Sequence, residues 1–234
     1  MATPALDQGQ LRELSDLRLQ LHRGDGATQE QLDAMGARWS AHREHLRNGE
    51  KDEVFHLADA CGNPTRLLAP RWLCHLLGLR HCCAHILLQW HSPGLGRVFV
   101  LQVRSWTRSD SAGHLDISVG GHVSGEGPTT SRETAYREMA EELGLTRADL
   151  QEGELVYCRG YENYTARPRE HFFNAEWRDV YCGTITTTGL EKISFDDQEV
   201  IGLYLCPEAE AGNLLEQQRI PIASGLEYSL PYCL

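Results

Sequence analysis

Apolar residues recur at helical spacing in one part of the chain and at strand spacing in another, and the spacing predicts which elements form. In residues 1–49, leucines recur every three or four positions from Leu11 to Leu21, which predicts an amphipathic helix. An Arg-Gly-Asp-Gly sequence follows, and then Thr28 and Gln31, which are spaced as a capping box. We therefore expect two antiparallel helices joined by a short glycine turn.

The second predicted helix carries a seam of residues that repeats at intervals of three and four. Its members are Leu32, Met35, Trp39, His42 and Leu46. Such a seam packs either on the chain's own domain or on a second copy of the chain, and the pattern leaves both open. The second alternative predicts a homodimer that uses the seam at least in part.

From Val54 onward the pattern changes to short apolar segments bounded by turn residues, which predict strands. We expect strands at 54–60, 65–68, 81–90, 97–104, 155–161, 171–186 and 199–206, and helices at 70–77, 131–143 and 208–218. Strands before and after a central helix predict an α/β fold around a mixed sheet. A polar break at 49–52 predicts an N-terminal helical extension over residues 1–49 and a larger domain over residues 50–234.

Charge and composition exclude some classes of function. The net charge of −11 argues against binding to a nucleic-acid backbone, which requires a basic surface. A small phosphorylated substrate stays open, because a metal ion can neutralise its charge locally. The most apolar stretch, at 72–90, contains an arginine and three histidines, which argues against a membrane span.

The cysteines and the N-terminus indicate where the protein resides. The eight cysteines have neither zinc-ribbon spacing nor that of a small disulfide framework, and no basic segment followed by an apolar run begins the chain. We therefore expect reduced thiols and a soluble, cytoplasmic protein. One cluster, formed by His75, His81, Cys82, Cys83 and His85, raises the question of zinc. Its spacing resembles no closed zinc site, so we expect partly buried, hydrogen-bonded side chains there.

Residues 120–145 combine a glycine-rich loop with a helix whose two ends are marked. Thr130 and Glu133 are spaced as a capping box, and Gly144 stands where helices commonly end in the left-handed region. The expected apolar stripe of this helix consists of Tyr136, Met139, Ala140 and Leu143, and the opposite side is expected to carry Arg137, Glu138, Glu141 and Glu142.

Three glutamates this close together repel one another unless a cation bridges them. Carboxylate oxygens, together with the oxygens of a phosphate, form the hard ligand set that suits Mg²⁺ or Mn²⁺. The alternative, for the glutamates taken alone, is a solvated acidic helix face.

The sequence Arg-Glu-Met-Ala-Glu-Glu-Leu-Gly-Leu at 137–145 resembles the second half of the Nudix box at every constrained position. The first half is displaced, because the Gly120-Gly121 and Gly125-Glu126 pairs stand where a longer loop would place them. Either Glu126 or Glu133 then takes the place of the remaining box glutamate. The resemblance implies a Nudix α/β/α sandwich around a mixed sheet, preceded here by the helical hairpin.

Residues 53–210 further resemble the branch of that family close to isopentenyl-diphosphate isomerase. In that resemblance His122 matches a metal-binding histidine, His81 lies near a second one, and Glu176 resembles a glutamate ligand. Gly120 stands in the place of the isomerases' catalytic cysteine. The resemblance therefore implies a metal site without the isomerase chemistry, which favours a diphosphohydrolase. Isomerase activity and a catalytically silent Nudix domain that binds a nucleotide or a protein stay as alternatives.

The site that this interpretation implies uses residues from several segments. The catalytic candidates are Glu142, Glu141, Arg137 and Glu176, and the metal ligands are Glu138, Glu141, Glu142 and Glu176. The substrate-binding candidates are Arg104, Arg108, Gly120, Gly121 and His122. Arg137 is expected to orient a carboxylate as the i,i+4 partner of Glu141. Glu176, or else Glu199, is a candidate general base.

The expected reaction is hydrolysis of a small diphosphate, such as a nucleoside diphosphate derivative, with Mg²⁺ or Mn²⁺. Substrate specificity is expected to come from loops at 105–114 and 161–170. Neither a nucleic acid nor a membrane is expected as a partner.

Overall fold

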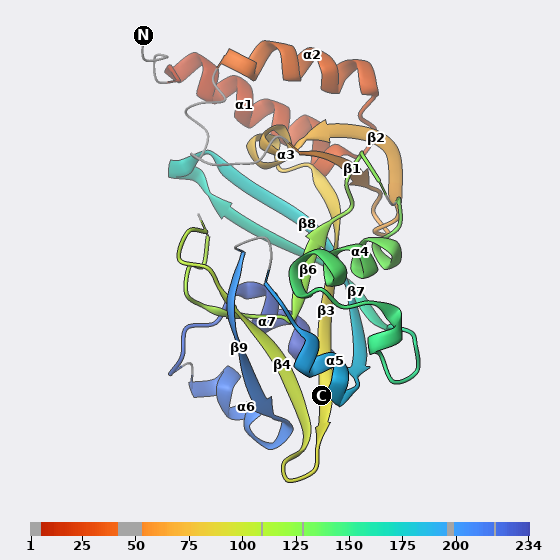
Figure 1. Cartoon of the computed structure of the whole chain (residues 1–234). Helices are drawn as coiled ribbons and strands as arrows, with labels where there is room; N and C mark the ends of the chain where they lie inside the picture. The colour runs from red at the N-terminus through yellow and green to blue at the C-terminus, as the bar shows by residue number, and fades with distance from the viewer. Residues whose placement is uncertain (1–5, 42–52, 109, 128, 196–198, 218) are drawn as a thin grey trace. The chain divides into compact units, whose positions relative to one another are not determined.

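The computed structural model describes residues 6–41, 53–108, 110–127, 129–195, 199–217 and 219–234 (Figure 1). The chain divides into two compact units. Unit 1 comprises Met1–Cys83, His122–Thr130 and Gly160–Arg178, and unit 2 comprises Ala84–Gly121, Ser131–Arg159 and Asp179–Leu234. The predicted boundary near residue 49 lies outside the described residues and stays a prediction.

Unit 1 begins with the predicted helical hairpin. Helix α1 (Gln8–Leu21) leads through a short 3₁₀ turn, η1 (His22–Gly24), into α2 (Gln29–Trp39), and the two helices run side by side in Figure 1. Both helices begin with a capping box, at Asp7 for α1 and at Thr28 for α2. The box at Thr28 was predicted, and it is confirmed. An ion pair between Glu13 and Arg38 links the early part of α1 to the end of α2, as an antiparallel arrangement requires.

The described part of the seam on α2 is covered by the chain itself. Leu32 and Trp39 are each 1% exposed and belong to one core cluster with residues of α1 and of the following hairpin. Packing on the chain's own domain is therefore the correct interpretation for these two residues. His42 and Leu46 lie outside the described residues, and the homodimer stays a prediction.

After the hairpin, strands β1 (Val54–Ala58) and β2 (Pro64–Pro70) pair antiparallel, and α3 (Arg71–Leu77) follows directly. The turn between the two strands is closed by Asp59, whose Oδ1 accepts hydrogen bonds from two backbone N–H groups, at Cys61 and Asn63. Strand β1 also pairs with the start of β3 (Arg80–Ser92), where Leu57 lies opposite His81. These elements confirm the predicted hairpin and short helix.

Unit 2 is centred on β4 (Gly96–Arg104), which pairs antiparallel with three strands. Its partners are the later part of β3, the short β5 (Leu115–Asp116) and β9 (Val200–Pro207); β4 and β9 lie side by side in Figure 1. The buried residues of α4 (Ser131–Leu143) share one cluster with apolar residues of β3 and β4. The strands predicted at 97–104 and 199–206 correspond to β4 and β9, whereas the two-residue β5 was not predicted.

Three further strands have residues in both units: β6 (Val119–His122), β7 (Val156–Arg167) and β8 (Phe172–Ile185). Strand β8 pairs with β7 and with β3, and β6 pairs with β3. The predicted loop at 161–170 is therefore wrong for its first part, since β7 continues to Arg167 and only η4 (Pro168–Glu170) and His171 separate it from β8. The polar residues of β7 hid the strand, because its alternation is between exposed and half-buried positions.

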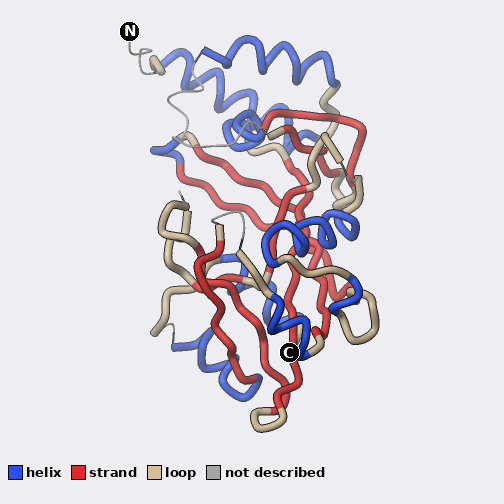
Figure 2. Tube along the Cα trace, viewed as in Figure 1, coloured by secondary structure: helices blue, strands red, loops and turns tan. Residues whose placement is uncertain are grey.

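Unit 2 also contains short helices that the apolar pattern did not reveal (Figure 2). These are η3 (Arg147–Asp149), α5 (Thr187–Lys192), α7 (Ser224–Ser229) and η5 (Leu230–Tyr232), in addition to the predicted α6 (Glu208–Gln217). Each missed element has fewer than two helical turns, which is too short to establish a periodic stripe. No helix among the described residues is long and apolar enough to cross a membrane.

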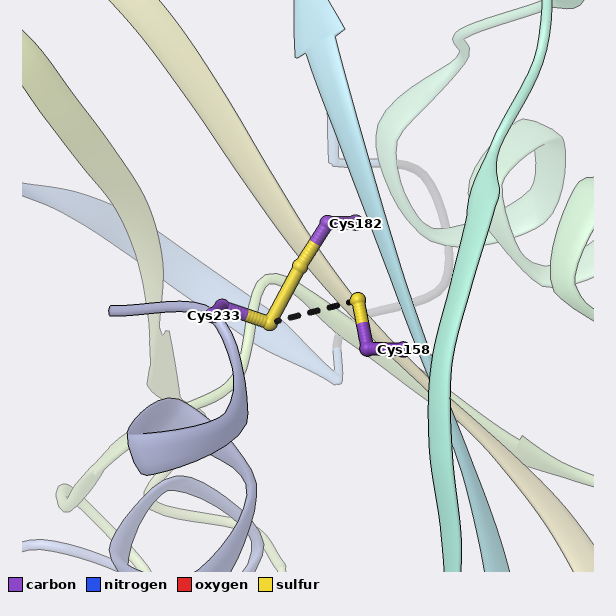
Figure 3. Close-up of side chains that lie close together, drawn as sticks. All are labelled: Cys158, Cys182 and Cys233. Carbon is purple, nitrogen blue, oxygen red and sulfur yellow. Dashed lines mark hydrogen bonds between the residues drawn. A yellow bond between two sulfur atoms is a disulfide. The ribbon is translucent and has the colours of Figure 1, made fainter.

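The expectation that all cysteines are reduced thiols is wrong for one pair. Cys182 on β8 and Cys233 near the C-terminus form a disulfide (Figure 3). The two residues are 51 positions apart in the sequence, so no local spacing indicated the pair. The other six cysteines are in the thiol form.

Gly62, in the turn between β1 and β2, offers a test of unit 1. Its φ is +85°, and a Cβ added there would lie 1.9 Å from the ring of Trp177. We expect Gly62→Ala to lower the free energy of unfolding by more than about 1 kcal/mol, since left-handed strain alone costs that much for a residue with a Cβ. Urea unfolding followed by tryptophan fluorescence measures this change.

Gly94→Ala is the matched control, because a Cβ at Gly94 meets nothing within 4 Å and its backbone is not left-handed. The free energy of unfolding of this control should stay within about 0.5 kcal/mol of the native value. Equal urea midpoints for the two variants would contradict the packing described for Gly62.

Candidate functional site

Helix α4 carries the three predicted metal-binding glutamates, but not on one solvent face. Its predicted span of 131–143 is confirmed, and Gly144 ends it with a φ of +67° and an N–H that donates to the carbonyl of Ala140. Glu141 is exposed and the side chain of Glu138 is 14% exposed, whereas Glu142 is 3% exposed. The glutamates therefore extend from the solvent side of the helix to its buried side.

This arrangement corrects the predicted apolar stripe. Glu142 follows Met139 by three positions and Ala135 by seven, so it shares their buried face, while Ala140 is exposed. The prediction counted Ala140 as apolar and Glu142 as polar. Which of the two is buried depends instead on which elements pack against the helix.

Arg137 is held between two of the glutamates. Its guanidinium lies 2.6 Å from Glu138 Oε1 and 2.9 Å from Glu141 Oε2. The predicted i,i+4 pair with Glu141 is therefore present, and the contact with Glu138 adds a second. Because one planar cation bridges both carboxylates, it fixes their side-chain orientations and offsets their mutual repulsion.

Gly121 lies directly against the carboxylate of Glu138. A Cβ added at Gly121 would stand 2.0 Å from Glu138 Cδ, so any other residue would displace the carboxylate of Glu138 from this position. At Gly120, a Cβ would meet Ile117 Cδ1 at 3.0 Å. The space beside Gly120 is thus partly filled by Ile117.

The two arginines proposed for phosphate binding are engaged in ion pairs within unit 2. Arg104 Nη1 lies 2.8 Å from Asp116 Oδ2, and Arg108 Nη1 lies 2.5 Å from Glu199 Oε2. Glu199, the second candidate for a general base, is therefore the partner of Arg108. Two further candidates, Glu126 in unit 1 and Glu133 in the first turn of α4, are both exposed.

A second group of candidate residues lies together in unit 1. His81, His122 and Glu176 place one ligand atom each within 4.8 Å of one another. The ring of Phe55 stacks on both histidines, at centroid distances of 4.8 Å from His81 and 4.4 Å from His122. His122 Nε2 is 3.4 Å from Glu176 Oε1. The structure thus brings together the three residues that the isomerase resemblance had related.

Burial determines the charge state of this group. His81 is fully buried, and this burial holds its pKa well below the ordinary value for histidine. For Glu176, burial alone would raise the pKa, but the positive charge of Arg178 and the contact with His122 outweigh it and keep that pKa well below its ordinary value. The group therefore combines a neutral imidazole with an ionised carboxylate.

Arg178 is the residue of this group that the sequence analysis missed. It is 5% exposed, and its Nη2 and Nε lie 2.7 Å and 2.8 Å from Glu176 Oε2. Asn174 Nδ2 donates to the other carboxylate oxygen at 2.8 Å. The spacing on β8 could have revealed both residues, since positions 174, 176 and 178 alternate along one face of a strand.

The five side chains of the cluster at 75–85 are buried more completely than expected, and the expected hydrogen bonds are present at His81, Cys82, Cys83 and His85. Cys82 Sγ donates to the carbonyl of Gly62, and Cys83 Sγ donates to that of Trp177. In unit 2, His85 Nδ1 is hydrogen-bonded to Ser229 Oγ. Of these residues only His81 belongs to a potential metal-binding group among the described residues.

The Arg178–Glu176 pair makes a prediction about stability and its pH dependence. Arg178→Gln should lower the free energy of unfolding by about 3–5 kcal/mol at neutral pH, because it leaves a buried carboxylate without its cation. The deficit should shrink as the pH falls from about 7 to about 5, since burial without Arg178 raises the pKa of Glu176 and protonation then removes the buried charge. In the native chain, ionised Glu176 contributes to the free energy of unfolding. This contribution should be lost only as the pH falls through the lowered pKa of Glu176.

Urea unfolding at the two pH values measures both effects. Arg132→Gln is the control, because Arg132 forms a 3.6 Å ion pair with Glu154 in which both side chains are exposed. A deficit for Arg178→Gln that is the same at both pH values would show that Arg178 acts through packing rather than charge.

Comparison with known proteins places this chain in a family. A family model described as the NUDIX domain matches residues 86–226, which include all of α4. Nudix hydrolase 3 of Arabidopsis thaliana is 30% identical over 168 residues, or 71% of this chain and 21% of that protein. The uncharacterised Nudix hydrolase orf19 of Rhodococcus erythropolis is 38% identical over 95 residues, or 40% of this chain and 48% of that protein. The matched region therefore spans less than half the length of either relative.

A solved structure supports the fold. The crystal structure of DR0079 from Deinococcus radiodurans aligns with a TM-score of 0.56 at 18% identity, covering 77% of this chain and 99% of that chain. Together with the family match, this likeness confirms the predicted Nudix fold, an α/β fold around a mixed sheet. This chain belongs to the Nudix family.

Proposed function

We propose that this chain is a metal-dependent hydrolase that splits a diphosphate linkage in a small phosphorylated substrate, such as a nucleoside diphosphate derivative. The observation that carries the proposal is the group of three glutamates on α4. Glu138 and Glu141 are tied to Arg137, Glu138 also packs against Gly121, and Glu142 is buried. The relatedness to Nudix hydrolases supports the reaction class.

The donor set on α4 fits Mg²⁺ or Mn²⁺, because Glu138, Glu141 and Glu142 offer hard carboxylate oxygens. When bound, such an ion supplies positive charge that neutralises the diphosphate oxygens and lowers the pKa of the attacking water. Glu142 is suited to hold a cation because water competes little at a buried position. Glu141, which is exposed, is the ligand best placed to meet an ion or substrate arriving from solvent.

Arg137 and Gly121 act on the glutamates rather than on the substrate. Arg137 holds Glu138 and Glu141 in fixed orientations, which makes it a positioning residue. Gly121 leaves room for the carboxylate of Glu138, and its own backbone N–H is a potential donor to phosphate. Arg104 and Arg108 would have to exchange their present carboxylate partners for a phosphate in order to bind substrate.

In unit 1, we assign Glu176 as a further metal ligand or general base, with His122 beside it. Both roles require an ionised carboxylate at neutral pH, and the guanidinium of Arg178 maintains that state by lowering the pKa of Glu176. The neutral form of His81 leaves it able to act as a ligand through a ring nitrogen.

The α4 glutamates provide the main test of the proposed function. Glu142→Gln keeps the size and helix propensity of the side chain but removes its charge, so turnover should fall at least about 10²-fold. Release of phosphate or of a split nucleotide, measured over a panel of diphosphates with Mg²⁺ and Mn²⁺, is the readout. Glu216→Gln, on the exposed surface of α6, is the control that should keep native turnover.

Two further variants locate the displaced box glutamate. If Glu126 fills the box position, Glu126→Gln should lower turnover more than Glu133→Gln does. If Glu133 fills it, the order should be reversed. A folded Glu142→Gln protein with near-native turnover would mean that the α4 glutamates have no part in the reaction.

A second candidate function is isomerisation of isopentenyl diphosphate, which is favoured by the grouping of His81, His122 and Glu176. That reaction needs an acid and a base on opposite sides of carbon atoms that are not acidic. Gly120 stands in the place of the cysteine that serves one side in the isomerases, and a glycine has no side chain to donate a proton. We therefore expect this chain to leave the substrate unisomerised.

Proton NMR of isopentenyl diphosphate, incubated in D₂O with the protein and Mg²⁺, reads both carbon exchange and double-bond migration. Unchanged carbon signals, together with hydrolysis of a member of the diphosphate panel, are the expected result. Conversion to dimethylallyl diphosphate at an ordinary enzymatic rate would establish the isomerase instead.

A further inference from the structure

Three cysteine sulfurs lie together in unit 2, apart in sequence from the candidate residues of the Nudix site (Figure 3). Cys158 is on β7, Cys182 is on β8, and Cys233 follows η5. The three Sγ atoms lie within 4.8 Å of one another, and 3.9 Å separates those of Cys158 and Cys233. Cys182 and Cys233 form a disulfide, whereas Cys158 is a free thiol.

The spacing of one pair of these sulfurs, Cys158 and Cys233, matches that of a thiolate metal site. In a tetrahedral zinc site the Zn–S distance is about 2.3 Å, which places the sulfurs about 3.8 Å apart. The Cys158–Cys233 separation already has this value. The Cα atoms of Cys182 and Cys233 are 6.6 Å apart, near the upper end of the range that a disulfide spans. After reduction, rotation of the two side chains can therefore separate their sulfurs without a shift of the backbone.

We propose that Cys158, Cys182 and Cys233 bind a zinc ion when the Cys182–Cys233 disulfide is reduced, and that formation of the disulfide closes this site. A thiol or phosphine reductant transfers two electrons to the disulfide, and two protons from solvent convert its sulfurs into thiols. Zn²⁺ then replaces the three thiol protons, which are released. The described residues place no fourth His, Cys, Asp or Glu in the group, so a water molecule or an external ligand completes the tetrahedron.

The surroundings suit a zinc ion with three thiolates, which carries a net charge of −1. Arg97 Nη1 lies 3.5 Å from the carbonyl oxygen of Cys233, and the guanidinium of Arg159 lies 5.2 Å from the ring centre of Tyr232, one residue before Cys233. Both cations therefore lie beside the segment that carries Cys233, and Arg97 also forms an ion pair with Glu208. Soft thiolate ligands also favour zinc over the hard Mg²⁺ that carboxylates prefer, so the two kinds of site would select different ions.

Two of the three cysteines, Cys158 and Cys182, are half-buried rather than buried. Cys182 lines a surface pocket of about 140 Å³ whose wall also includes Glu152 and Glu154, two carboxylates that attract cations. Burial raises the pKa of Cys158, so without metal this residue is a protonated and poorly reactive thiol at neutral pH. Because binding releases protons, zinc affinity should increase with pH.

Cobalt is the probe for this site, because Co²⁺ bound to thiolate has a sulfur-to-metal charge-transfer absorption that Co²⁺ bound to carboxylates lacks. We expect the reduced full-length chain to develop this absorption with one Co²⁺ per chain and to lose it when Zn²⁺ is added. Cys158→Ser should weaken cobalt binding at the thiolate site at least about 100-fold, since a lost ligand costs no less than a lost supporting contact. Cys206→Ser, which changes a buried thiol elsewhere in unit 2, should keep the absorption.

Thiol titration of the unfolded chain establishes the redox state of each sample, with eight thiols after reduction and six when the disulfide is intact. The oxidised chain should give no charge-transfer absorption. Circular dichroism verifies that Cys158→Ser is folded, and Cys182→Ser provides a second ligand variant that should show the same loss. Glu142→Gln should retain the absorption, which separates this site from the proposed hydrolase site.

Three results would overturn the proposal. One is the absence of the absorption in a chain with eight free thiols, and another is native absorption in both the Cys158→Ser and Cys182→Ser variants. The third is equal cobalt binding by the oxidised and reduced chains, which would contradict closure by the disulfide.

Discussion

Taking a carboxylate out of water costs several kcal/mol unless a cation or a set of hydrogen bonds replaces the lost solvation, and the packing of both units depends on meeting this cost. In unit 1, Glu176 is enclosed by Arg178, Asn174 and His122. In unit 2, Asp116 is paired with Arg104. Asp149 accepts hydrogen bonds from Thr146 and contacts Lys192, and these interactions lower its pKa. Glu176, Asp116 and Asp149 are thus each held by a cation, and Glu176 and Asp149 by further hydrogen bonds, which leaves their side chains in defined positions.

The same constraint explains why the candidate site residues lie on regular elements. A helix or strand fixes the distance between a carboxylate and the cation that pairs with it. Arg137 and Glu141 are held in this way on α4, and Glu176 and Arg178 on β8. A glycine completes the arrangement on α4, because the backbone of Gly121 approaches the carboxylate of Glu138 more closely than any other residue would allow. Rigid placement of charge of this kind is what stabilisation of a polyanionic transition state requires.

Local signals in the sequence were sufficient where a few neighbouring residues determine the structure. The ends of α4, the capping box at Thr28 and the Arg137–Glu141 pair are all of this type. The burial of Glu142 could not be predicted, because the angular pattern of the helix does not show which neighbouring element covers its edge. Contacts between distant segments were also missed, and the disulfide between Cys182 and Cys233 is the clearest case.

The helical hairpin at the N-terminus has a consequence for how the chain can be altered. Leu14, Leu21, Leu32 and Trp39 lie in the same buried cluster as Phe55 and the apolar side of α3. A chain shortened to begin after the hairpin would therefore expose apolar residues of unit 1 to solvent, although the family match begins only at residue 86. The hairpin is an integral part of the hydrophobic core of unit 1, so family boundaries drawn from sequence similarity are a poor guide to the smallest fragment that folds.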